Sequence, residues 1–308
     1  MEGNSTNTTT GKEIWNFILH LRWHYQVFIL SGGFLLGGFL SPSINWTSYL
    51  IQFFNVHLLL FGGATAYNSY WDKDEGPIGG LKNPPPMSRW MWMMSILMQA
   101  IGLLIAIPAG NAFVAVYALS MLLFWLYSTP HARWKGEPVK SLLAIGISTG
   151  TNSFLMGYLS AGMNEINIST LCAALGVALV ILSLYPISQL YQMDDDRKRG
   201  DRTFAIKYGF TGVFNFFVIS FAAGILLISG ALFVDHVILS VGFLLVGFGI
   251  GYRVQNKILQ LTAEKDDYEL VMRIKFSTSL LFVAFILFIL LIKHTGLGIV
   301  TGLDVLLM

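Results

Sequence analysis

Long apolar segments separated by short polar ones dominate this sequence. Each apolar segment is about as long as a helix must be to cross a bilayer, whose hydrocarbon core of about 30 Å takes roughly 20 residues. Membrane-spanning strands would instead alternate apolar and polar residues over about ten positions, and these segments do not alternate. The pattern predicts nine transmembrane helices, near residues 25–41, 48–68, 90–108, 112–128, 141–161, 168–191, 213–233, 236–253 and 275–294.

The composition supports a membrane protein. Hydrophobic residues make up 55% of the 308 residues and charged residues only 12%, whereas soluble domains carry about 25% charged residues. A soluble protein this apolar would expose large hydrophobic patches. The net charge of +2 is small and no basic run suggests nucleic-acid binding, so we expect a lipid bilayer as a partner and no nucleic acid.

The charges predict how the chain sits in the membrane. We expect one membrane domain over residues 14–295, with a disordered tail at 1–13 and a C-terminal tail at 296–308. Cytoplasmic loops of membrane proteins are enriched in Lys and Arg. If the N-terminus is cytoplasmic and nine helices cross, Lys293 is the only basic residue on the outer side. The sequence therefore predicts a multi-pass protein with a cytoplasmic N-terminus.

Acidic residues are scarce and concentrate after the second and sixth apolar segments. The first cluster comprises Asp72, Asp74 and Glu75, and the second begins at Asp194–Asp196. Both apolar segments end on the predicted cytoplasmic side. We therefore expect the two clusters to face one cavity at the inner end of the helix bundle.

The spacing within these clusters favours a magnesium site. Asn68 and Asp72 lie four residues apart, as do Gln192 and Asp196, so each pair shares one face of a helix. Mg²⁺ takes oxygen ligands and is typically held by one or two carboxylates together with substrate phosphates. Two such helix ends suit a diphosphate bridged by Mg²⁺. The alternative is a solvated loop whose carboxylates pair with neighbouring Lys and Arg residues.

Three motifs at these helix ends resemble those of the UbiA superfamily of intramembrane prenyltransferases. Asn68-x-x-x-Asp72 and the segment Tyr191–Thr203 are similar to the two Asp-rich motifs of the family, and Tyr127–Gly136 is similar to its Tyr-Ser-x-Pro…Lys stretch. The resemblance covers roughly residues 15–295. It implies an all-α membrane fold with nine helices around a central cavity, Mg²⁺ as the cofactor, and geranyl, farnesyl or geranylgeranyl diphosphate as the donor.

The sequence departs from the family motifs at two positions. The first motif reads Asn-x-x-x-Asp-x-x-x-Asp, and Gly76 occupies its last position here. The second reads Asp-x-x-x-Asp, and Gln192 occupies its first position. We therefore expect the metal ligands to include neighbouring acids. The candidate ligands are Asn68, Asp72, Asp74, Glu75, Gln192, Asp195 and Asp196.

The resemblance also implies which residues bind the diphosphate and act in catalysis. We expect Asp72 and Asp196 to be catalytic through the metal, and Tyr127 and Tyr191 to stabilise an allylic cation with their rings. The Gly- and Pro-rich loop at 76–86 is expected to cap the diphosphate. The candidate diphosphate-binding residues are Lys73, Lys82, Arg133, Lys135, Lys198 and Arg202.

Three functions are compatible with this chemistry. In a prenyltransferase, the donor ionises at its allylic C–O bond while Mg²⁺ and cationic side chains stabilise the departing diphosphate, and a lipophilic or aromatic acceptor then takes the prenyl group. In a terpene cyclase of the same fold, the cation attacks its own double bonds. A transporter would place ionisable residues near the bilayer midplane, whereas here they cluster at the inner helix ends. We favour the prenyltransferase.

Overall fold

The computed structural model describes residues 10–73, 76–162 and 165–295. Within these residues the chain is helical, and its only β-structure is an isolated bridge between Ile78 and Leu81. The α-helices are α1 (Thr10–Leu21), α2 (Trp23–Tyr25), α3 (Ser31–Leu40), α4 (Trp46–Phe54), α5 (Gly62–Asp72), α6 (Arg89–Ala106), α7 (Asn111–Ser128), α8 (Pro138–Ile145), α9 (Asn152–Ser160), α10 (Ile168–Leu184), α11 (Ile187–Leu190), α12 (Met193–Lys198), α13 (Phe204–Phe233), α14 (Val237–Ile258) and α15 (Tyr268–Thr295). The linking helical turns are η1 (Gln26–Leu30), η2 (Asn55–Phe61), η3 (Ile107–Ala109), η4 (Trp134–Gly136), η5 (Gly146–Thr151) and η6 (Lys265–Asp267).

The described helices account for all of the predicted transmembrane segments. Eight of them are long and apolar enough to cross a membrane: Trp46–Asp72, Arg89–Ala109, Asn111–Ser128, Pro138–Ser160, Ile168–Leu190, Phe204–Phe233, Val237–Ile258 and Tyr268–Thr295. The predicted first segment corresponds to a further helical run made of α2, η1 and α3. The expected all-α membrane fold is confirmed, and the count of nine holds if this composite run is included.

Some helix ends differ from the prediction. The helix α1 begins at Thr10, so residues 10–13, which we expected in the tail, are helical, while residues 1–9 and 296–308 lie outside the described residues. The helix α13 begins at Phe204 and bends at Gly209, whose φ is 64°. The helix α15 begins at Tyr268 and not near residue 275. The hydrophobic pattern misses these extensions because they carry charged residues.

Glycines bring neighbouring helices into close contact. A Cβ atom added to Gly37 of α3 would lie 2.2 Å from the Phe154 carbonyl oxygen in α9, and one added to Gly224 of α13 would lie 2.8 Å from the Gly176 carbonyl oxygen in α10. Helices in a membrane gain little from hydrophobic burial against one another, so they associate through such close packing of small residues. These contacts fix the walls that enclose the interior.

Lys293 is the basic residue that the predicted topology places on the outer side, and its contacts explain why a lysine lies there. Its Nζ donates to the carbonyl oxygen of Phe39 at 2.7 Å and to that of Ser41 at 3.2 Å. These carbonyls lie at the C-terminal end of α3, where helix carbonyls lack intrahelical partners and a cation is favourable. Lys293 therefore stabilises a helix end.

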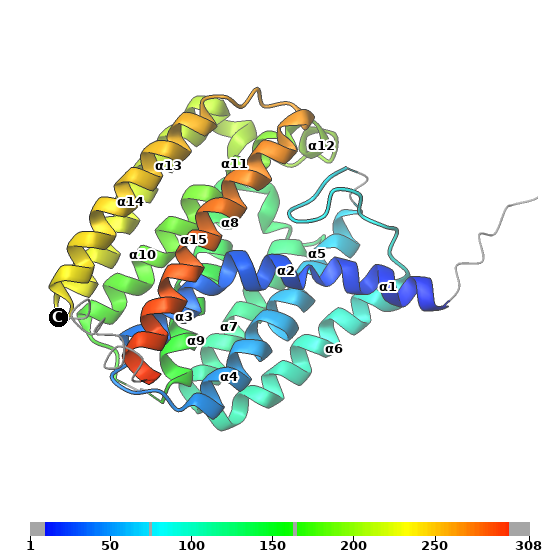
Figure 1. The fold of residues 1–308 in the computed structure, drawn as a ribbon. Helices are drawn as coiled ribbons and strands as arrows, with labels where there is room; N and C mark the ends of the chain where they lie inside the picture. The colour runs from blue at the N-terminus through cyan, green and yellow to red at the C-terminus, as the bar shows by residue number, and fades with distance from the viewer. Residues whose placement is uncertain (1–9, 74–75, 163–164, 296–308) are drawn as a thin grey trace, which may run out of the picture.

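Asp72 and the second acidic cluster lie at one end of the bundle. Figure 1 shows α12 and the loop that follows α5 facing each other there. Gly76 and Asp195 come from opposite sides, and a Cβ atom added to Gly76 would lie 3.2 Å from Asp195 Oδ2. The Gln192 side chain donates to the Pro77 carbonyl oxygen at 3.3 Å. The fold therefore brings together two segments that are far apart in the sequence.

The predicted orientation can be tested by labelling in intact cells. In a Cys172→Ser background, which removes the only cysteine, we expect Asn111→Cys to react with a membrane-impermeant maleimide and Lys198→Cys to react only after permeabilisation. Both positions are exposed in the structure. Labelling of Lys198→Cys in intact cells would contradict a cytoplasmic site.

Candidate active site

A polar cavity of about 140 Å³ lies between the two acidic helix ends. Its carboxylates come from the end of α5, from α12 and from the turn after α12, and its basic residues come from the start of α2, from η4 and from the end of α12. Asn68 and Tyr127 also line it. The charged lining residues are Arg22, Asp72, Lys135, Asp196, Arg199 and Asp201. We call this space the polar cavity.

Asp72 is held at the C-terminal end of α5 by a polar network. Asn68 donates to its Oδ2 at 2.8 Å, Asn68 in turn accepts from Ser128 at 3.0 Å, and Lys135 forms an ion pair with its Oδ1. The C-terminal end of a helix carries a partial negative charge, so a carboxylate is unfavourable there without a nearby cation. Lys135 supplies that cation here.

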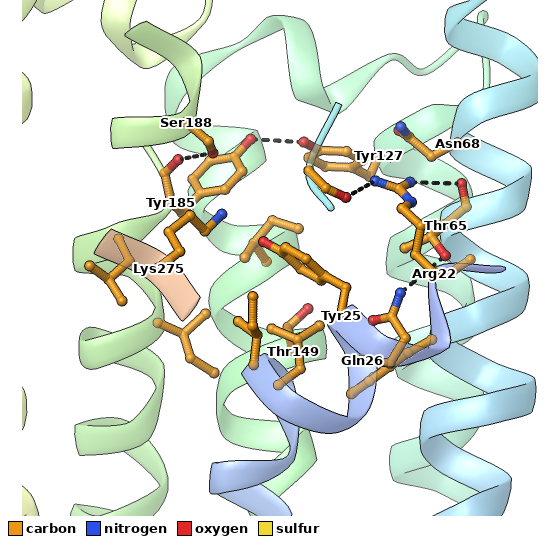
Figure 2. Close-up of a pocket in the computed structure, with 18 of the residues that line it drawn as sticks. Arg22, Tyr25, Gln26, Thr65, Asn68, Tyr127, Thr149, Tyr185, Ser188 and Lys275 are labelled. Carbon is orange, nitrogen blue, oxygen red and sulfur yellow. Dashed lines mark hydrogen bonds between the residues drawn. The ribbon is translucent and has the colours of Figure 1, made fainter. Parts of the chain in front are cut away.

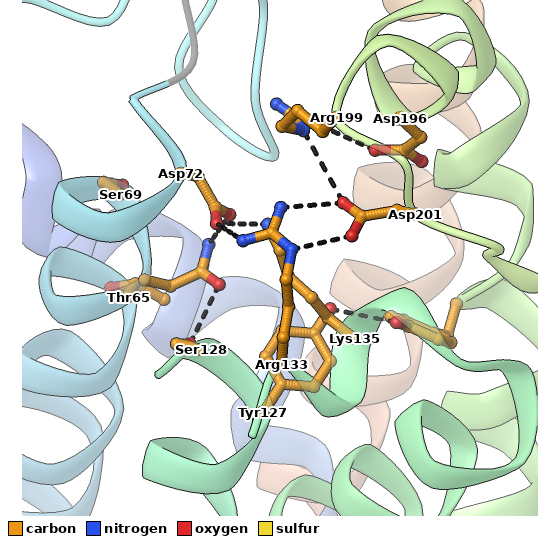
Figure 3. Close-up of polar contacts among 12 residues, drawn as sticks. Thr65, Ser69, Asp72, Tyr127, Ser128, Arg133, Lys135, Asp196, Arg199 and Asp201 are labelled. Atoms are coloured by element: carbon orange, nitrogen blue, oxygen red, sulfur yellow. Dashed lines mark hydrogen bonds and ion pairs between the residues drawn. The ribbon is translucent and has the colours of Figure 1, made fainter. Parts of the chain in front are cut away.

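Two arginines bind the carboxylates on the opposite wall (Figure 3). Arg133 makes a bidentate contact with Asp201, with distances of 2.7 Å from Nε and 2.8 Å from a terminal nitrogen. Arg199 donates to Asp196 Oδ1 at 2.6 Å and lies 3.6 Å from Asp201. Arg133 also comes within 4.0 Å of Asp72. One charged network therefore joins the ends of α5 and α12.

Burial raises the pKa of the Asp196 carboxyl above its usual value, and the hydrogen bond and charge of Arg199 act in the opposite direction. The hydrogen bond to Asp201 raises the pKa of Arg133. Buried carboxylates in such a site must be compensated by cations, because leaving one unpaired costs several kcal/mol, about 3–5.

Two further cavities continue from the polar cavity into the bundle. The first, of about 220 Å³, shares Tyr127, Tyr185 and Gln192 with the polar cavity; we call it the middle cavity (Figure 2). The second, of about 620 Å³, shares Ile29 and Leu30 with the middle cavity and lies among α3, α10, α13, α14 and α15. Its lining is almost entirely aliphatic and aromatic; we call it the apolar cavity.

Aromatic residues form the boundary between the polar and apolar regions. The hydroxyl groups of Tyr127 and Tyr185 are 2.9 Å apart. Tyr191 lines the middle cavity and its ring packs edge-on against Tyr268, with centroids 5.3 Å apart. Three turns of π-helix, η1, η2 and η5, contribute residues to the middle cavity. Such wide turns are common at functional sites.

The structure brings together part of the predicted site. Asn68, Asp72, Gln192 and Asp196 line the polar cavity, as do Lys135 and Tyr127. Arg133 joins the same network through Asp72 and Asp201. Asp74 and Glu75 lie outside the described residues.

Other predicted residues lie around the site and not in it. Lys73 faces a separate cavity bounded by His20, Ser69, Tyr70 and the loop prolines. Lys82 is exposed and ion-paired with Glu269. The Lys198 side chain is 76% exposed and lies 3.8 Å from Asp195. The Arg202 residue is exposed, and its backbone N–H donates to the Gly136 carbonyl oxygen at 2.8 Å.

Sequence reasoning missed Asp201, Arg199, Arg22 and Lys275 as lining residues of these cavities. Arg22 donates to the carbonyl oxygens of Gly79 at 2.9 Å and Thr65 at 3.1 Å. Its backbone is left-handed, with φ of 48°, which is uncommon outside glycine and frequent at functional sites. The charge count treated Arg22 and Lys275 as ordinary inner-face residues. Only the fold reveals that they point inward.

The oxygen donors of the polar cavity suit Mg²⁺. Among the described residues, no three His, Cys, Asp or Glu side chains form a metal cluster. Asp72 and Asp196 nevertheless face the same cavity, with the amide oxygens of Asn68 and Gln192 on its walls. This donor set matches an ion that uses one or two carboxylates and completes its shell with water and phosphate oxygens.

A protein-family model described as the UbiA prenyltransferase family matches residues 27–276. The chain belongs to the UbiA prenyltransferase family. Among solved structures, this UbiA chain is similar to a UbiA homolog from Archaeoglobus fulgidus bound to GPP and Mg²⁺, with a TM-score of 0.69 and 16% identity over 89% of this chain and 99% of that one. A digeranylgeranylglyceryl phosphate synthase structure gives a TM-score of 0.60 and 17% identity over 92% and 97%. At this identity both show the fold alone.

Two curated proteins are similar to part of this UbiA chain. Digeranylgeranylglyceryl phosphate synthase from Methanothrix thermoacetophila is 29% identical over 177 residues, which are 56% of this chain and 62% of the relative. The 2-acylphloroglucinol 4-prenyltransferase from Humulus lupulus is 28% identical over 135 residues, which are 38% of this chain and 30% of the relative. The matched stretches thus span less than two thirds of either relative.

The contacts of Asp196 predict a pH effect. Arg199→Met removes a hydrogen bond and a charge that lower the pKa of Asp196, so this pKa should rise. If ionised Asp196 is needed for turnover, the acid limb of the plot of log(kcat/KM) against pH should move to higher pH. Arg197→Met is the matched control, because Arg197 pairs with the exposed Asp194. Identical acid limbs for wild type and Arg199→Met would contradict this role of Asp196.

Proposed function

We propose that this chain is a Mg²⁺-dependent prenyltransferase that ionises an isoprenyl diphosphate and transfers its prenyl group to a lipophilic or aromatic acceptor. The main observation behind the proposal is the order in which the three cavities follow one another. The polar cavity, with its carboxylates and cations, adjoins the aromatic middle cavity and then the apolar cavity. An isoprenyl diphosphate has the same order of chemistry: a charged head, a reactive allylic carbon and a hydrocarbon chain.

Charge balance in the polar cavity supports a metal requirement. Asp72, Asp196 and Asp201 already pair with Lys135, Arg133 and Arg199. A diphosphate adds several negative charges to this balanced network, and burial makes an uncompensated charge expensive. Bound Mg²⁺ would supply compensating charge and stabilise the departing diphosphate. Asp72 and Asp196, with Asn68 beside Asp72, are the residues that would hold it.

The chain's own residues have distinct tasks in the transfer. Lys135 and the arginines are placed to move from carboxylate partners to the diphosphate as charge develops on it, an electrostatic stabilisation that is preorganised by the fold. Tyr127, Tyr185 and Tyr191 surround the middle cavity, where the allylic carbon would lie. Their faces can stabilise a cation, and the apolar walls keep water from it.

The relatives favour transfer over cyclisation. One curated relative is named as a digeranylgeranylglyceryl phosphate synthase and the other as a 2-acylphloroglucinol 4-prenyltransferase. The middle cavity has polar side chains that an acceptor could contact. A terpene cyclase needs no such acceptor. The donor alone, incubated with enzyme and Mg²⁺, separates the two: release of a cyclic terpene identifies a cyclase, whereas dependence on an added acceptor identifies a transferase.

Removing the carboxylate of either Asp72 or Asp196 should strongly reduce turnover. We expect Asp72→Ala and Asp196→Ala each to lower kcat/KM about 100-fold or more, measured as diphosphate release with geranylgeranyl diphosphate, acceptor and Mg²⁺. Asp194→Ala is the matched control, because Asp194 lies in the same helix as Asp196 but its side chain is 61% exposed. Circular dichroism and gel filtration in detergent check that each variant is folded. Full activity in both alanine variants would refute the proposed site.

Filling the apolar cavity should shorten the accepted donor. Gly242 of α14 lines this cavity, and a Cβ atom added to it would meet no heavy atom of the described residues within 4 Å, so Gly242→Phe should place its ring there. We expect the ratio of kcat/KM for geranylgeranyl over geranyl diphosphate to fall. Gly249 of α14 is equally open but is not part of the cavity lining, which makes Gly249→Phe the control. An unchanged ratio in Gly242→Phe would place the hydrocarbon chain elsewhere.

A further inference from the structure

A tight turn in the loop after α5 lies where the polar and middle cavities meet. Ile78 and Leu81 exchange backbone hydrogen bonds of 3.0 and 2.9 Å, and Gly80 between them takes a φ of 82°. Ile78 lines the polar cavity, and Gly79 lines both cavities. We call residues 78–81 the loop tip. It forms part of the wall beside which the diphosphate and the allylic carbon of the proposed donor would lie.

The segment around α2 holds the loop tip by hydrogen bonds and packing (Figure 2). Arg22 donates to the Gly79 carbonyl oxygen at 2.9 Å, and His24 donates to the Gly80 carbonyl oxygen at 3.1 Å. The ring of Tyr25 lies against the same turn, because a Cβ atom added to Gly80 would come within 2.8 Å of it. The tip therefore has a defined position relative to the start of the membrane domain.

A further contact to this loop comes from Gln192, which precedes α12. Its Nε2 donates to the carbonyl oxygen of Pro77, one residue before the loop tip, at 3.3 Å. A carbonyl oxygen only accepts, so the amide nitrogen must be the atom that faces it. Gln192 itself lines both the polar and the middle cavity. An ionised aspartate, the residue of the family motif at this position, has no donor and could not make this contact.

Both departures from the family motifs lie at this one contact between the loop and α12. Gly76 precedes Pro77, and a Cβ atom added to Gly76 would lie 3.2 Å from Asp195 Oδ2. Aspartates at positions 76 and 192 would add two carboxylates beside Asp195, which would repel one another unless a cation lay between them. Glycine and glutamine instead let the loop approach α12 closely and bind it directly. The two departures are therefore explained together as a protein–protein contact.

We propose that Gln192 is a positioning residue that holds the loop tip over the cavities and so keeps water from the allylic carbon. The proposal rests on the proposed transferase function. Water that reaches an allylic cation captures it: the C–O bond to the diphosphate breaks, the water oxygen bonds to the allylic carbon and a proton passes to solvent, which yields a prenyl alcohol. With the tip held in place, the cation reacts with the acceptor. Gln192 thus favours transfer over hydrolysis.

Hydrogen exchange in the purified protein tests the contact without substrate or metal. Gln192→Met removes the donor and keeps the length of the side chain, whereas Gln192→Glu keeps its shape and an oxygen that can bind Mg²⁺ but loses the N–H donor. We expect both variants to speed amide exchange in a peptide covering residues 76–88 about fivefold, the effect of one lost hydrogen bond. Gln260→Glu is the control, because Gln260 is exposed and lines none of the three cavities.

Formation of geranylgeraniol from geranylgeranyl diphosphate and Mg²⁺, without acceptor, measures the capture of the cation by water. We expect its rate to rise in both variants by about the same factor as the exchange, because each water molecule enters when the loop opens. The Mg²⁺ concentration that gives half-maximal binding of geranylgeranyl S-thiolodiphosphate should stay unchanged in Gln192→Met. Gel filtration in detergent checks that each variant is folded.

Three results would overturn the proposal. The first is wild-type loop exchange in both variants. The second is weaker Mg²⁺-dependent binding in Gln192→Met but not in Gln192→Glu, which would make Gln192 a metal ligand. The third is faster exchange without more alcohol, which would show that the loop tip does not exclude water. If the wild type neither binds nor turns over any isoprenyl diphosphate, the proposed function fails, and the exchange result alone decides whether Gln192 holds the loop.

Discussion

The compensation of buried charge at one end of the helix bundle is the constraint on which this site depends. Asp72, Asp196 and Asp201 are all buried, and each contacts a lysine or an arginine. Such a network is stable only while its charges balance, because an ion left alone in a protein interior costs several kcal/mol. An anionic substrate can therefore enter only with cations of its own or by taking over the cations already present. This requirement is the physical basis of the metal-dependent diphosphate chemistry that we propose.

The network also explains why distant parts of the chain must meet. Asp72 closes α5, Lys135 and Arg133 follow α7, and Asp196 and Asp201 lie in and just after the short helix α12. Bidentate pairing of Arg133 with Asp201 adds directional specificity to the charge interaction. The loop after α5 is tied to the same region through Gly79, whose carbonyl oxygen accepts from Arg22, and through Pro77, whose carbonyl oxygen accepts from Gln192. Four separate segments thus contribute to the site, and the middle cavity and the apolar cavity continue from it into the bundle.

Much of this arrangement was predictable from the sequence, and the rest has identifiable physical reasons. Apolar segment length predicts the helices, and the position of Asp72 and Asp196 after two helices on the same side predicts that they converge. Asp201 was not singled out because its burial depends on a turn at Gly200, whose φ is 77°, which folds the chain back toward Arg133. Lys275 escaped notice because a charge count cannot separate a lysine at the membrane surface from one in a cavity wall. Whether Asp74 and Glu75 are ligands stays a prediction, since they lie outside the described residues.

Binding of an unreactive donor analogue tests the charge-compensation account most directly. Titration of geranylgeranyl S-thiolodiphosphate into the purified protein, with Mg²⁺ or with a chelator, measures affinity without turnover. The account predicts Mg²⁺-dependent binding that is lost in Asp72→Ala and in Asp196→Ala. Equal affinity in the presence of the chelator, or in both variants, would contradict it.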